Sequence, residues 1–179
     1  ASIDYRLLFR GGRLDEAMTD VQLAWNWWRS QRQTFSLDPE RMGLLGCSAG
    51  AALTVLSSDQ CEGLWKMIGI YGVYDFCDMP GRPSRLPARL LLGSADVEVW
   101  AERSPVCHLG ANVPTLLMHG TADTLVKKRH TDVMADARRR ARYPVTTRYY
   151  VDEPHGFLQD GPLRAAVPVA LRDIVDFLE

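Results

Sequence analysis

The stretch that decides the fold runs from Met42 to Ser58 and reads MGLLGCSAGAALTVLSS. Its first part, Met42 to Leu45, is a short apolar run that enters a glycine, which is typical of a buried parallel strand. Gly46-Cys47-Ser48-Ala49-Gly50 then matches the pattern G-x-S-x-G, and the small residues that follow predict a helix over 49–58. A strand, a tight turn and a helix in this order predict a turn that lifts the Ser48 hydroxyl clear of a sheet. The residues that flank the serine are expected to be small so that the turn can close.

On both sides of this stretch, predicted strands alternate with predicted helices. The hydrophobic periodicity predicts strands over 3–8, 66–71, 113–118 and 145–151, and helices over 15–32, 126–142 and 163–178, the last with a bend at Pro168. Alternation of this kind is typical of an α/β fold in which a mostly parallel sheet is flanked by helices on both faces.

One segment has a different texture. Between residues 72 and 105 there are four prolines and few periodic runs, apart from a short helix predicted over 86–92. We expect a small lid-like insertion here, although a purely structural excursion explains the composition equally well. The length of 179 residues predicts a single domain, 1–179, that contains this insertion.

Composition excludes several classes of protein. The net charge of −1 argues against a nucleic-acid binder, and no apolar run reaches the roughly 18 residues of a membrane span. The first five residues lack the basic and apolar regions of a signal peptide, so a cytoplasmic location is expected. The spacing of the four cysteines does not match a zinc site, and no metal is expected.

A serine hydroxyl needs a base before it can act as a nucleophile. His155 lies in a loop between the last predicted strand and the last predicted helix, and such loops are where parallel sheets assemble their sites. His119, at the end of the 113–118 strand, is the alternative, although its position favours a structural hydrogen bond. His108 and His130 have no comparable setting.

The base needs a carboxylate to orient it, and this is expected after the 113–118 strand. Asp123 lies there, and the order Ser48, Asp123, His155 is the α/β-hydrolase order. The N–H of Ala49, at the start of a helix, is expected to donate to an oxyanion. Other carboxylates that compete with Asp123 for this role are Asp96, Asp152, Glu153 and Asp160.

These motifs, taken together, resemble the hormone-sensitive-lipase-like and carboxylesterase branch of the α/β-hydrolase superfamily. Besides the G-x-S-A-G turn, the chain has segments similar to the family's D-Y-R-L, D-P-x-R-I, S-P, H-G-x-x-D-x-x-V and H-G-F motifs, at 5–7, 38–43, 104–105, 119–126 and 155–157. The match runs in order along nearly the whole chain.

The resemblance implies a serine hydrolase of short-chain acyl esters that works without a metal or organic cofactor. It assigns Ser48 as nucleophile, His155 as base and Asp123 as orienting carboxylate. It also identifies a departure, because the family's H-G-G-G segment and N-terminal strands precede the D-Y-R-L strand, and no H-G-G occurs in this sequence. Residues 3–8 are therefore expected to pair directly with 42–46, within a homodimer. Two alternatives are that a second copy of the chain fills the gap by strand exchange, and that the sequence is a piece of a longer protein.

Two alternatives remain open at this point. A prolyl-oligopeptidase-like serine peptidase shares the serine turn and the order of the three residues. A non-catalytic or vestigial hydrolase fold that serves as an interaction module would explain the departure. The side chains expected to line an acyl pocket are equally suited to core packing: Phe157, Leu125, Val126, Leu86 and Trp100.

Overall fold

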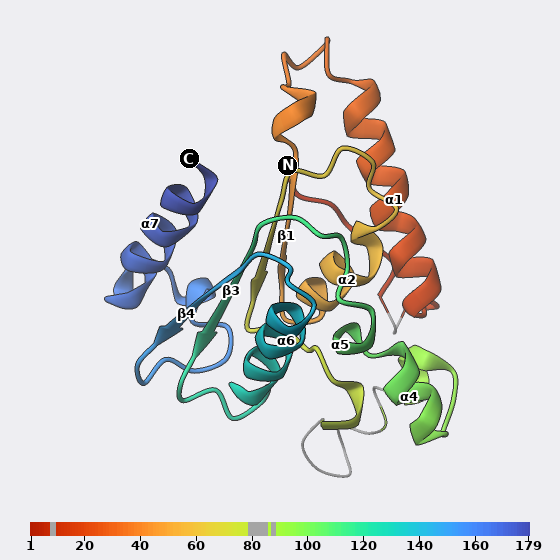
Figure 1. Ribbon diagram of the computed structural model, residues 1–179, viewed down its shortest axis with the longest axis vertical. Coiled ribbons are helices and arrows are strands. Elements are labelled where there is room, and N and C mark those ends of the chain that lie inside the picture. Colours follow the sequence, from red (N-terminus) through yellow and green to blue (C-terminus); the bar gives the residue numbers. More distant parts are fainter. Residues whose placement is uncertain (8–9, 79–85, 87–88) are drawn as a thin grey trace.

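The computed structural model of the chain describes residues 1–7, 10–78, 86 and 89–179 (Figure 1). Its centre is a parallel sheet with the strand order β1-β2-β3-β4, built from β1 (Gly43–Cys47), β2 (Lys66–Ile70), β3 (Thr115–Gly120) and β4 (Val145–Tyr150). Since the strands are parallel and in register, their carboxyl ends meet at one edge of the sheet.

Helices cover both faces of this sheet, as predicted. Leu117 points to the face covered by α2 (Ala49–Ser58) and α6 (Arg129–Arg140), while Ile68 and Leu116 point to the face covered by α7 (Ala166–Leu178). The long helix α1 (Leu14–Ser30) packs on α2. Figure 1 shows α7 on one side of the sheet and α1, α2 and α6 on the other.

The remaining elements are short. They are η2 (Pro39–Arg41), η3 (Phe76–Asp78), α4 (Val97–Arg103), α5 (Pro105–His108) and η4 (Phe157–Leu163). Three of them fall in or next to the segment expected to be an insertion, where Phe76 and Trp100 pack into a core cluster with Leu14 of α1. The predicted helix over 86–92 agrees with helical residues at 86 and 89–92, whereas 87–88 lie outside the described residues. A lid function for this segment stays a prediction.

The predicted first strand is wrong. Residues 1–7 adopt no regular secondary structure, because the backbone N–H of Arg6 is bound by Asp20 of α1 at 2.8 Å. The Arg6 guanidinium binds the same carboxylate, and Tyr5 packs against the core cluster beside α1. Residues 3–7 are therefore held by a helix and do not pair with 42–46, and residue 8 lies outside the described residues.

As a result β1 lies at the edge of the sheet, with β2 as its one neighbour among the described residues. An apolar groove of about 910 Å³ follows its free side, between β1, α1 and residues 1–5. Leu45, in the middle of β1, is 52% exposed.

A search of the described residues finds no helix with the length and hydropathy to cross a membrane. The expected cytoplasmic location stays a prediction.

Candidate active site

Ser48 sits in a strained turn between β1 and α2. Its backbone angles, φ 54° and ψ −119°, lie in a region that side chains other than glycine rarely adopt. The turn is held because the N–H of Ser48 donates to the carbonyl of Ile70 at the end of β2, 2.9 Å away. The serine side chain therefore projects at the carboxyl edge of the sheet.

The two glycines of the G-x-S-x-G motif, Gly46 and Gly50, differ in how much space surrounds them. A Cβ at Gly46 would collide with the carbonyl of Gly50 and lie 2.6 Å from Thr54 Oγ1, so no larger residue fits. A Cβ at Gly50 would meet no atom within 4 Å. The expectation that the flanking residues must be small therefore holds for Gly46 and is wrong for Gly50.

Ala49 is the first residue of α2. N–H groups of a helix's first turn have no acceptor within the helix, and the helix dipole adds partial positive charge there. Ala49 is an exposed residue, and its N–H belongs to this first turn and directly follows the serine in the chain.

Asp123 lies in the loop after β3, with its side chain fully buried. Its Oδ1 accepts hydrogen bonds from the N–H groups of Leu125 and Val126, at 3.0 and 2.8 Å. These two bonds fix the carboxylate plane and leave Oδ2 facing the loop that follows β4.

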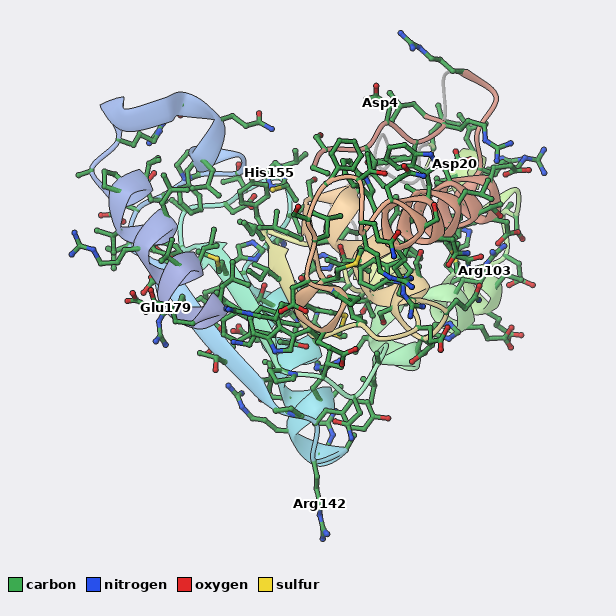
Figure 2. The ribbon with its side chains drawn as sticks, turned by 90° about the horizontal axis from the view of Figure 1, so that it is seen from above. Asp4, Asp20, Arg103, Arg142, His155 and Glu179 are labelled. Carbon is green, nitrogen blue, oxygen red and sulfur yellow. The ribbon has the colours of Figure 1, made fainter. Side chains whose placement is uncertain are left out.

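His155 comes from that loop and joins the other two residues. Its Nδ1 is 2.7 Å from Asp123 Oδ2 and its Nε2 is 3.0 Å from Ser48 Oγ. Figure 2 shows His155 at the opposite side of the molecule from Arg142, which precedes β4. The structure thus brings together the three residues selected from the sequence, from loops after three different strands.

Burial and hydrogen bonding act on Asp123 in opposite directions. Desolvation alone raises the pKa of its carboxyl, but the contacts with His119 and His155 and the N–H of Val126 outweigh it. The net result is a pKa held below the ordinary value, so this group stays ionised beside His155.

His119 is buried and structural in its contacts, as its position at a strand end suggested. Its Nε2 donates to the carbonyl of Val126 at 2.8 Å, and its Nδ1 is 2.7 Å from Thr131 Oγ1. That leaves His119 unable to reach Ser48 as a base. What the sequence did not reveal is that Nε2 also lies 3.2 Å from Asp123 Oδ2, so two imidazoles approach one carboxylate oxygen.

Other acidic and histidine side chains considered from the sequence bind partners outside this arrangement. Asp96 caps α4 by accepting from the N–H of Glu98, and Arg164 binds both Glu153 and Asp160. His130, although buried in α6, accepts from the N–H groups of Tyr74 and Asp75. Within the described residues, no group of three or more histidine, cysteine or acidic side chains could hold a metal ion.

Most of the side chains considered for an acyl pocket belong to the core. Phe157, Val126 and Trp100 are each at most 4% exposed and lie within buried clusters. Leu125, at 58%, is exposed beside Asp123. An aromatic residue that the sequence did not single out, Tyr71, contacts His155 instead.

The fold and this arrangement define a protein of the α/β-hydrolase class. Sequence comparison extends this, since residues 1–137 match the BD-FAE family, and the chain belongs to that family. The matched span includes Ser48 and Asp123 and ends before His155.

Individual relatives agree with this class. A probable carboxylic ester hydrolase, LipM of Mycobacterium tuberculosis (strain ATCC 25618 / H37Rv), is 26% identical over an alignment of 169 residues that covers 82% of this chain and 39% of that protein. The chain therefore spans about two fifths of the length of that curated relative.

Two solved structures share the fold. The thermostable carboxylesterase EstE1, cloned from a metagenomic library, superimposes with a TM-score of 0.85 at 22% identity, over 99% of this chain and 68% of its own. Esterase 2 of Thermogutta terrifontis, in a form phosphonylated by sarin, gives a TM-score of 0.78 at 20% identity, over 97% and 70%.

Proposed function

We propose that the chain is a serine hydrolase that cleaves short-chain carboxylic esters through an acyl-serine intermediate. The observation that carries the proposal is the continuous set of contacts from Asp123 Oδ2 through the His155 ring to Ser48 Oγ, at 2.7 and 3.0 Å. This set places a base within reach of the serine proton and a carboxylate behind the base. The relatives named above add support, since their names describe ester hydrolases.

The first half of the reaction transfers the acyl group to the enzyme. Ser48 Oγ attacks the ester carbonyl carbon while His155 Nε2 takes the hydroxyl proton, which gives a tetrahedral oxyanion. The N–H of Ala49 donates to that oxyanion. His155 then gives the proton to the departing alcohol oxygen, and the C–O bond of the ester breaks.

The second half regenerates the enzyme. Water attacks the acyl carbon, His155 accepts its proton, and the proton returns to Ser48 Oγ as the carboxylic acid leaves. Asp123 holds the Nδ1–H tautomer and stabilises the imidazolium that forms in both halves.

A non-catalytic interaction module is the second candidate, because only one oxyanion donor, the Ala49 N–H, is assigned. Loss of a single oxyanion donor reduces kcat by roughly 10²–10³-fold in a serine protease. A site with one donor is therefore expected to be slow but active, which favours the hydrolase.

A fluorophosphonate probe tests the proposal directly. We expect covalent labelling of the wild type at Ser48, located by mass spectrometry of the labelled peptide, and no labelling of Ser48→Ala. Hydrolysis of p-nitrophenyl acetate and butyrate should fall by about 10³–10⁴-fold in kcat in the same variant, which is the roughly 10⁶-fold loss in a complete serine protease site less the roughly 10²–10³-fold contribution of the second oxyanion donor. Ser57→Ala, which changes a buried serine in α2, is the matched control and should label like the wild type.

Two outcomes would decide against the proposal. If the folded wild-type chain is not labelled by the probe, Ser48 is not an active nucleophile, and the interaction module is favoured. Faster cleavage of a proline-linked p-nitroanilide than of the esters would favour the peptidase.

A further inference from the structure

Tyr71 is the first residue after β2 and lies directly against His155. Its ring centroid is 4.9 Å from that of the imidazole, with an angle of 61° between the planes, an edge-on contact. Tyr71 is only 1% exposed. The phenol ring is thus a fixed surface beside the proposed base.

The Tyr71 ring has a second aromatic neighbour. Phe157 contacts it with a centroid separation of 5.8 Å, and Tyr150 contacts Phe157 at 5.1 Å. Phe157 is fully buried. A column of three aromatic rings, Tyr150, Phe157 and Tyr71, therefore ends on the imidazole.

Tyr71 also belongs to the buried cluster against which Cys47, the residue before Ser48, packs. Burial, together with the neighbouring Cys47 thiol, raises the pKa of the Tyr71 hydroxyl. Tyr71 therefore lies between the strand end that carries Ser48 and the ring that would take its proton.

The backbone of Tyr71 is in a strained conformation. Its φ of 40° is in the left-handed region, which a bulky residue rarely adopts. A hydrogen bond of 2.7 Å from its N–H to the carbonyl of Met118 fixes it there. Such strain persists only where the surroundings enforce it.

The orientation of the His155 ring is easily disturbed. Rotation about the bond to a histidine ring is soft, because this torsion has broad wells and not three sharp ones. The His155 side chain is 18% exposed, and a tilt of its ring moves Nδ1 and Nε2 away from their partners together. A ring packed against one side restricts that tilt.

We propose that Tyr71 is a positioning residue that sets the tilt of the His155 ring so that Nε2 faces Ser48 Oγ while Nδ1 faces Asp123. The packing of the phenol ring provides this. The kinetic part of this inference rests on the proposed ester hydrolysis, whereas the geometric part does not.

The test compares three variants of the whole chain. Tyr71→Leu removes the ring, and we expect kcat for p-nitrophenyl acetate to fall by about 10–100-fold with KM within about twofold, since small misplacements of catalytic groups have effects of this size. Tyr71→Phe keeps the ring and should restore kcat to within about fivefold of the wild type. Tyr74→Leu is the matched control, because it removes a fully buried tyrosine from the same loop and should leave kcat within about threefold.

A second measurement does not require turnover. The proton on His155 Nδ1 should give a downfield nuclear magnetic resonance signal that is present in the wild type and in Tyr71→Phe, and lost or broadened in Tyr71→Leu. His155→Gln identifies the signal. If Tyr71→Leu fails to fold, Tyr71→Met, an unbranched replacement without a ring, takes its place.

The outcomes separate the two proposals. If the wild type has no esterase activity but the signal of the His155 Nδ1 proton is lost in Tyr71→Leu, the proposed function is wrong and the positioning role is supported. Tyr71→Leu that keeps the wild-type kcat and the wild-type signal overturns the positioning role and leaves the esterase in place.

Discussion

At the scale of single residues, Asp123 is the best-defined part of the site. Its two oxygens accept from different groups, Oδ1 from backbone N–H groups and Oδ2 from His155, and His119 lies against the second oxygen. The sequence predicted Asp123 and His155 because both follow strands in the right order. It predicted a structural hydrogen bond for His119 but not the contact of that ring with Asp123, and it did not single out Tyr71, because an aromatic residue after an apolar run is a usual core component.

The lowered pKa of Asp123 leads to a pH-dependent stability. Because the folded-state pKa lies below the ordinary value of about 3.9, the carboxylate stabilises the folded chain above that pH. This contribution is lost as the pH falls through the lowered folded-state pKa. We therefore expect Asp123→Asn to reduce the free energy of unfolding most near neutral pH, with a gap to the wild type that narrows in acid.

Urea unfolding of both proteins between neutral pH and about pH 3 measures that gap. Asp4→Asn, which removes an exposed carboxylate near the N-terminus, is the control and should remain close to the wild type throughout. A gap for Asp123→Asn that is equally large at every pH would show that the carboxylate charge is not the cause.

At the scale of elements, hydrophobic periodicity predicted helices and strands correctly where burial of the element decides its conformation. The helix expected over 49–58 is Ala49–Ser58, and the strand expected over 145–151 is Val145–Tyr150. The strand expected over 3–8 failed because its apolar alternation was satisfied in another way, by packing of Tyr5 beside α1. The competing bond from Arg6 N–H to Asp20, fourteen residues away, leaves no signal in local periodicity.

The steric account of the turn between β1 and α2 can be tested by substitution of its two glycines. We expect Gly46→Ala to lower the free energy of unfolding by about 1–3 kcal/mol, the usual cost of forcing a methyl group into a packed site, because its Cβ meets backbone of α2. Gly50→Ala should be neutral or raise stability by about 0.5–1 kcal/mol, since alanine favours the helix and the space is open.

Urea midpoints of the two variants, compared with the wild type, measure these effects. Gly50→Ala also serves as the control for Gly46→Ala, because it adds the same methyl group four residues away. Equal destabilisation by both substitutions would contradict the steric account of the motif.

At the scale of the whole molecule, the free edge of β1 is the feature that the fold leaves open. Gly43–Cys47 contains neither lysine nor proline, which proteins use to block the pairing of edge strands, and Leu45 is 52% exposed in its middle. We expect this edge to support self-association of the chain. The homodimer considered from the sequence therefore remains a proposal, by a route other than pairing with residues 3–8.

Leu45→Lys should weaken that self-association, because a charge at the centre of the edge disfavours strand pairing. Analytical ultracentrifugation over a range of protein concentrations measures it. Leu171→Lys places the same charge at an equally exposed leucine, 52%, on α7 and should leave the association unchanged. A wild type that is monomeric at all concentrations would remove the expectation.

The wide sequence separation of Ser48 and His155 has a practical consequence. The two side chains are 107 residues apart in the chain, and they meet only when β1 and β4 occupy their places in one sheet. Chemical capture of Ser48 by a reagent that depends on His155 would therefore count the correctly assembled molecules in a mixture. Such a reagent could follow refolding, or sort a library of variants by assembly, without any knowledge of the natural substrate.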